Sequence, residues 1–135
     1  MIDHARAQFD LDRPRADGRT RRQHLEAAAR VKGRRMASLE VPPLPEEAEH
    51  LWAWFQELNL ARTGSGFGPN PLSYAEIDAW ARLSGRAPSP AEVQALRALD
   101  VVWLAAQAKA REEAQPKGPD ASPMPPPGGP RRTPR

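Results

Sequence analysis

Three short stretches decide the fold of this chain: residues 50–58 (HLWAWFQEL), 73–83 (SYAEIDAWARL) and 91–104 (AEVQALRALDVVWL). Each repeats apolar residues at steps of three and four, the spacing that places them on one face of an α-helix. All four tryptophans and the only tyrosine lie in these stretches, although aromatic residues make up just 6% of the chain. We therefore expect a compact helical unit here, and we expect the function to reside in it.

Capping residues mark the borders of these helices. Ser73 followed by Glu76 has the spacing of a capping box. Ser89 followed by Glu92 has the same spacing, with a proline at the first helical position. The last helix is expected to continue to about Ala114 because alanine has a high helix propensity.

The helix that begins near residue 46 has a predicted buried face and one aromatic residue outside it. The spacing places five residues on that face: Ala48, Leu51, Trp52, Phe55 and Leu58. Trp54 points elsewhere, so it is either covered by another segment or presented as a binding anchor. Residues 63–72 (TGSGFGPNPL) end this helix as a loop. Phe67 in that loop is expected to pack back against the aromatic face.

The flanking segments predict less structure. Thr20 and Gln23 form a third capping box, and Gly33 ends the helix that they open. The predicted organisation is a flexible arm at 1–19, a basic helix and proline-rich linker at 20–45, a helical domain at 46–115, and a disordered, proline-rich basic tail at 116–135. The fold class is all-α, a small bundle of three to four helices with disordered termini.

Charge is distributed unevenly along the chain, behind a formal net charge of +3. Residues 13–39 carry nine Lys or Arg against two acidic residues, whereas residues 40–115 carry six against eleven. A basic leader beside an acidic domain predicts intramolecular docking or an acidic partner, and disfavours nucleic acid as the main partner.

Composition also bears on the compartment. The chain has no cysteine, which excludes disulfides and thiolate metal sites and favours a reducing environment. No apolar run is long enough for a membrane span, and the first residues lack the apolar core of a signal peptide.

The residues do not predict an enzyme. The glycine-rich loop at 63–72 follows a helix and contains prolines, whereas a phosphate-binding loop follows a strand. The three histidines lie on separate segments without the spacing of a metal-binding helix. Asp100 lies beside the apolar stripe of the last helix, and we expect it to pair with Arg97, Arg62 or an indole N–H. No catalytic residue, cofactor or metal is predicted.

Several phrases of the sequence resemble a known family. The phrases HLWAWFQELNLAR, GFGPNPLSYAEIDAW and SPAEVQALRALD, and the leader DGRTRRQHLEAAARVKGRRMASLEVPPLP before them, are similar to the small tail assembly chaperones encoded in the tail modules of tailed phages and prophages. The resemblance covers about two thirds of the chain, from residue 19 to residue 103.

This resemblance implies a partner and a task. Such a chaperone would bind the tape measure protein, a long helical polypeptide prone to aggregation, in the cytoplasm of the bacterial host until the tail tube protein polymerises around it. The tail tube protein is a second candidate partner. A small helical unit with surplus aromatic residues can hold the apolar face of another helix in a groove.

The expected groove lies between the second and third of the four predicted helices, the one that begins near residue 46 and the one that Ser73 opens. Trp54, Phe67 and Tyr74 are the predicted contacts at its rim, and Arg21 and Arg22 are predicted to influence association through their charge. Alternatively, the aromatic side chains complete the core of the domain itself.

Two other functions remain open at this point. A structural tail or head-completion component would be retained in the virion. A small nucleic-acid-binding protein would use the basic leader, and the acidity of the main domain argues against it.

Overall fold

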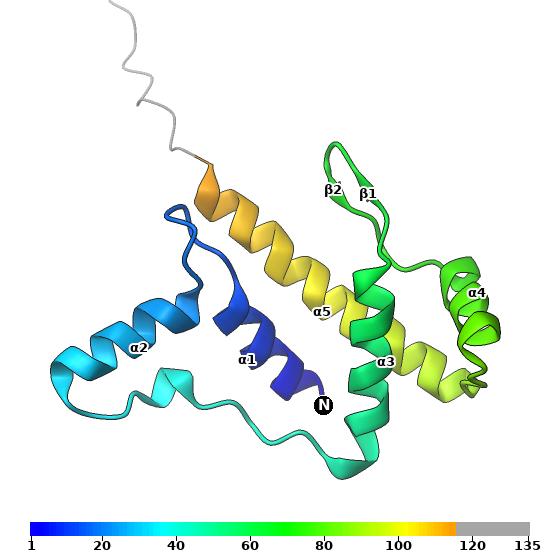
Figure 1. Ribbon diagram of the computed structural model, residues 1–135, viewed down its shortest axis with the longest axis horizontal. Coiled ribbons are helices and arrows are strands. Elements are labelled where there is room, and N and C mark those ends of the chain that lie inside the picture. Colours follow the sequence, from blue (N-terminus) through cyan, green and yellow to red (C-terminus); the bar gives the residue numbers. More distant parts are fainter. Residues whose placement is uncertain (116–135) are drawn as a thin grey trace, which may run out of the picture.

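The computed structural model describes residues 1–115 and consists mainly of helices (Figure 1). The five α-helices of this range are α1 (Ile2–Asp12), α2 (Arg21–Lys32), α3 (Glu49–Leu60), α4 (Tyr74–Ser84) and α5 (Pro90–Ala114). Two short 3-10 turns, Ala37–Leu39 and Glu46–Ala48, interrupt the linker before α3. A small antiparallel hairpin, β1 (Gly64–Ser65) and β2 (Gly68–Pro69), joins α3 to α4. The mainly helical fold agrees with the prediction, with one helix more than the expected three to four.

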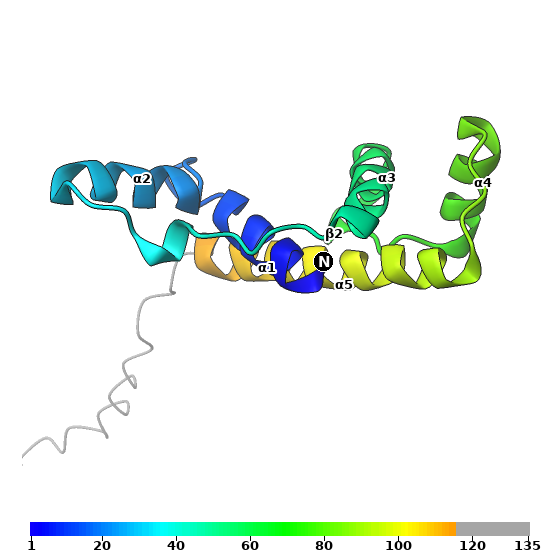
Figure 2. The ribbon, with the colours of Figure 1, turned by 90° about the horizontal axis from the view of Figure 1, so that it is seen from below.

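The long helix α5 is the base on which the other helices pack. Figure 1 shows α1 lying alongside α5 and α3 crossing it, and Figure 2 shows α3 and α4 rising from the same side of its N-terminal half. Helix α2 extends beyond the opposite end. Within residues 1–115 no helix is both long and apolar enough to cross a membrane.

A single apolar core joins α1, α3, α4 and α5. Phe55, Leu96 and Leu99 are its largest fully buried side chains. The whole cluster comprises Ala5, Phe9, Leu51, Phe55, Leu58, Leu72, Ile77, Leu96 and Leu99. Burial of these side chains is the main favourable contribution to folding.

The expectation of a flexible arm is wrong for residues 2–12, which form α1. Ala5, Phe9 and Leu11 are buried, and the Phe9 ring stacks on Trp52 with a centroid distance of 5.3 Å. The helix has only these few apolar residues, so its sequence shows little periodicity. Tertiary packing, rather than local propensity, stabilises such a short helix.

Helix α2 follows its predicted borders. The Thr20–Gln23 capping box is present, and Gly33 ends the helix in the left-handed conformation at φ +63°. No residue of α2 is buried. Ion pairs hold it instead, because Arg21 contacts Asp10 of α1 and Arg22 Nε lies 3.0 Å from Asp12 Oδ1.

Helices α4 and α5 also begin where their capping residues indicate, whereas α3 begins at Glu49, after a 3-10 turn, instead of near residue 46. Both serine–glutamate boxes are present, and α5 ends at Ala114 as predicted. The pKa of Glu76 is lowered from its usual value because the Ser73 backbone N–H and hydroxyl donate to its carboxylate. On α3, Leu51, Phe55 and Leu58 are buried together with Ala48 just before it, whereas Trp52 is only half-buried. The predicted tail at 116–135 lies outside the described residues.

A buried ion pair ties the loop after α3 to the middle of α5. Arg62 Nη2 lies 2.6 Å from Asp100 Oδ1, and both side chains are almost completely buried. The backbone N–H of Leu72 donates to Asp100 Oδ2 at 2.8 Å, and Arg62 Nη1 donates to the Asn70 carbonyl at 2.7 Å. The Arg62 guanidinium also stacks over Trp103. Of the predicted partners of Asp100, Arg62 is therefore the one present.

We expect Asp100→Ala to lower the free energy of unfolding by about 3–5 kcal/mol, because it leaves the Arg62 guanidinium buried without a counter-charge. Urea denaturation followed by circular dichroism measures this loss. Asp78→Ala is the matched control, because it breaks an exposed Asp–Arg pair with Arg82 on α4 and should change stability little. Equal effects of the two substitutions would contradict the role assigned to the buried pair.

Phe9→Ala should also be strongly destabilising, by about 3–5 kcal/mol, because the ring fills the core between Trp52 and Phe55. Arg6→Ala, on the exposed side of the same helix, serves as the control in the same denaturation experiment. An unchanged free energy of unfolding for Phe9→Ala would indicate that α1 does not contribute to the core.

Candidate functional site

An apolar pocket of about 450 Å³ opens between α3 and α4. The lining residues are Leu58, Ala61, Leu72, Glu76, Ala79, Trp80, Leu83 and Ser84. Glu76 is the one charged member of this lining. The pocket lies between the two helices for which the sequence predicts a groove, although its lining includes none of the three predicted aromatic contacts.

The pocket exists because α4 packs on the domain through a different face from the one that lines the pocket. Ile77 and Ala81 on α4 are buried, whereas the side facing the pocket carries the small Ala79 and the exposed Leu83. The first residue after α3, the small Ala61, lines the opposite side. Small residues between large apolar ones leave a hollow with an apolar rim. Such hollows are typical binding sites for apolar side chains of a partner.

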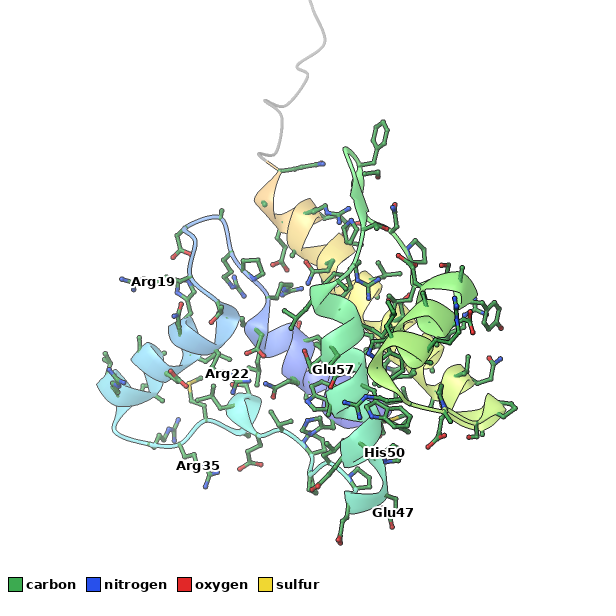
Figure 3. The ribbon with its side chains drawn as sticks, turned by 45° about the vertical axis from the view of Figure 1, so that its right-hand side comes forward. Arg19, Arg22, Arg35, Glu47, His50 and Glu57 are labelled. Atoms are coloured by element: carbon green, nitrogen blue, oxygen red, sulfur yellow. The ribbon has the colours of Figure 1, made fainter. Side chains whose placement is uncertain are left out.

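Trp54 lies behind the pocket wall rather than at its rim. Its ring makes an edge contact with Trp80, with 5.6 Å between the centroids, and another with His50 at 5.0 Å. The Trp80 indole N–H donates to Glu57 at 3.1 Å, and the same carboxylate accepts a hydrogen bond from Arg86 at 2.6 Å. Figure 3 shows His50 and Glu57 along α3. Trp54 is thus covered by another segment, α4, whose Trp80 lies in the pocket wall.

Phe67 does not pack back on the domain, so that expectation is wrong. It lies in the turn between the two strands and is 96% exposed. The two-residue strands hold the loop in a hairpin that directs the ring away from the core, and Arg111 Nη1 donates to the Phe67 carbonyl at 2.8 Å.

Tyr74 faces α5, on a different side of α4 from the pocket. Its ring lies under the Arg97 guanidinium at 4.3 Å, and it lines a separate hollow with Ile77, Ala81 and Val93. The pKa of Tyr74 is lowered because Gln94 and Arg97 donate hydrogen bonds to the phenol oxygen. Trp54, Phe67 and Tyr74 therefore lie on three separate surfaces.

The predicted cationic contacts, Arg21 and Arg22, are engaged within the chain, in their ion pairs with α1. Arg19 and Arg35, in contrast, extend away from the body in Figure 3. Arg21 and Arg22 thus pair with α1, outside the acidic domain at 40–115 on which docking of the basic leader was expected, whereas Arg13 pairs with Glu113 inside that domain.

No group of three potential metal ligands occurs among residues 1–115. The histidines make separate contacts: His4 with the Pro42 carbonyl, His24 with Asp17 and His50 with Glu92.

The prediction concentrated on aromatic residues and missed two exposed leucines, Leu83 in the pocket lining and Leu60 at the end of α3. Leu60 and Leu83 are 90% and 89% exposed, and both fall outside the buried stripes of their helices. An apolar residue outside the stripe of an amphipathic helix is the signal that could have identified them.

Comparison with known proteins assigns the family. The family model described as phage tail assembly chaperone matches residues 28–105, which is more than half of the chain and includes the whole pocket lining. No curated protein and no solved structure matches the chain. By this match the chain belongs to the phage tail assembly chaperone family.

Proposed function

We propose that this chaperone binds the tape measure protein and keeps it soluble while the tail tube assembles in the cytoplasm of the bacterial host. Family membership supports a role in tail assembly, with tail proteins as partners and without catalysis. The observation that carries the choice of site is the apolar pocket between α3 and α4, which lies within the matched residues.

The pocket suits the apolar face of a helix. A helix presents apolar side chains at steps of three and four residues, so neighbouring side chains can enter a groove of this kind together. Leu83, which lines the pocket and is 89% exposed, provides apolar surface for the same partner. A tape measure protein rich in amphipathic helix would offer many such segments.

The size of the pocket suits reversible binding. Each large apolar side chain buried there contributes about 1.5–3 kcal/mol, from which the loss of motional freedom on association is subtracted. Two or three such anchors give a moderate affinity. A moderate affinity allows the tail tube protein, the second candidate partner, to displace the chaperone as it polymerises.

The residues predicted to contact the partner now have different proposed roles. Trp54 acts through Trp80, which it supports in the pocket wall. Tyr74, Arg21 and Arg22 remain predictions as contact residues, although Arg21 and Arg22 already neutralise Asp10 and Asp12. This internal pairing also reduces the cationic surface that a nucleic-acid-binding function would need.

We expect Leu83→Glu to weaken or abolish capture of the co-expressed tape measure protein, because it places a charge at the apolar rim. Its side chain is 89% exposed, so the fold should be preserved, as circular dichroism will show. Val31→Glu on α2 is the matched control, because Val31 is equally exposed and lies far along the chain from the pocket.

The readout is the amount of tape measure protein that co-purifies with tagged chaperone in the soluble fraction. Full capture by a folded Leu83→Glu variant would place the binding surface elsewhere. Failure of the wild-type chaperone to capture the tape measure protein would overturn the proposed function itself.

We also expect Trp54→Ala to weaken the same capture by about tenfold, because Trp80 loses its support. The control is Val101→Ala, which truncates an exposed apolar residue on α5. Isothermal titration with a soluble tape measure fragment measures the difference. An unchanged dissociation constant would show that Trp54 has no part in shaping the site.

A further inference from the structure

The hairpin between α3 and α4 presents Phe67 on a hydrogen-bonded support. Ser65 and Gly68 pair across the two strands, and the Ser65 hydroxyl accepts from the Phe67 backbone N–H and donates to the Gly68 carbonyl. Gly68 adopts φ +130°, a conformation that side chains rarely allow, under the guanidinium of Arg111. At the hairpin base, Asn70 N–H donates to the Thr63 carbonyl.

A phenyl ring that is 96% exposed on such a support has the properties of a binding anchor. Little conformational entropy is lost when a preorganised aromatic side chain is buried by a partner. Phe67 contributes nothing to the core of its own domain, because it lies outside the buried cluster. Its partner must therefore provide an apolar pocket.

The same protein has a pocket that is apolar and large enough for a phenyl ring. A cavity of roughly 150 Å³ is enough to bind benzene, and the hollow between α3 and α4 offers about 450 Å³ with a lining that is mostly aliphatic and aromatic. Glu76 is the charged lining residue, and Arg111 accompanies Phe67 through its hydrogen bond to the Phe67 carbonyl. An entering hairpin would thus bring a cation toward an anion.

The position of the hairpin suggests a two-fold arrangement. The hairpin leaves the domain beside Ala61 and returns beside Leu72, and both residues line the pocket. Anchor and pocket are therefore neighbours on one molecule. Two copies facing each other can exchange hairpins, so that each phenyl ring enters the other pocket and the contact closes as a dimer instead of a filament.

We propose that the free chaperone forms a homodimer in which Phe67 of each copy occupies the α3–α4 pocket of the other. The contact buries two phenyl rings and their surroundings, a small interface for which association is weak and depends on concentration. If the proposed function holds, the dimer covers the site that the tape measure protein uses. Binding of the tape measure protein would then dissociate the dimer.

Analytical ultracentrifugation of the full chain alone, over a range of concentrations, tests the dimer without the tape measure protein. The wild type should show a reversible monomer–dimer equilibrium. Phe67→Ala should raise the dissociation constant at least about tenfold, while Phe67→Leu should retain much of the association. Val31→Ala, at an equally exposed apolar residue on α2, should leave the equilibrium unchanged.

Mixing two variants tests whether the α3–α4 pocket is the site that binds Phe67 of the other copy. Phe67→Ala keeps an intact pocket, and Leu83→Glu keeps an intact anchor, so each variant alone should be monomeric. An equimolar mixture keeps one of the two contacts, so it should associate more weakly than the wild type and more strongly than either variant alone. Circular dichroism on both variants checks that they are folded.

Several outcomes would overturn the proposal. These are a wild type that stays monomeric up to about 100 µM, a dimer that Phe67→Ala does not weaken, or a mixture that associates no more strongly than either variant alone. The same Phe67→Ala protein should still capture the tape measure protein. Capture without dimerisation of the wild type would refute the dimer alone, and dimerisation without capture would refute the proposed function alone.

Discussion

The buried pair of Arg62 and Asp100 is the interaction on which the surroundings of the pocket depend. A charged pair inside an apolar core is tolerable only when its remaining hydrogen-bonding capacity is used. Here the extra contacts go to the backbone of Asn70 and Leu72, which flank the hairpin. The pair thereby fixes where the chain leaves α3 and where it enters α4. Both the pocket and the exposed hairpin are consequences of that fixed path.

The four tryptophans and Phe67 have different roles. Trp52, Trp54, Trp80 and Trp103 pack against other rings or against guanidinium groups at the edges of the core. Phe67 alone projects from the domain on its hairpin. This division accounts for a small protein that has a stable body and still presents apolar surface to partners, as an assembly chaperone requires.

Charge serves mainly to organise the chain itself. The basic leader docks on acidic residues of α1, and Arg13 pairs with Glu113 at the far end of α5. These contacts hold α2 beside the body although it buries no residue of its own. The apolar pocket, and not the basic leader, therefore carries the proposed recognition of a partner.

The sequence by itself determined the features that depend on neighbouring residues. The three capping boxes, the ends of α2 and α5, and the helical fold class follow from local hydrogen bonding and apolar spacing, and the family follows from short phrases in the same region. Only the tertiary structure decided whether α1 joins the core, which partner Asp100 takes, and where Phe67 points. These outcomes depend on contacts between residues far apart in the chain, such as Phe9 with Trp52 and Arg62 with Asp100, which no local pattern records.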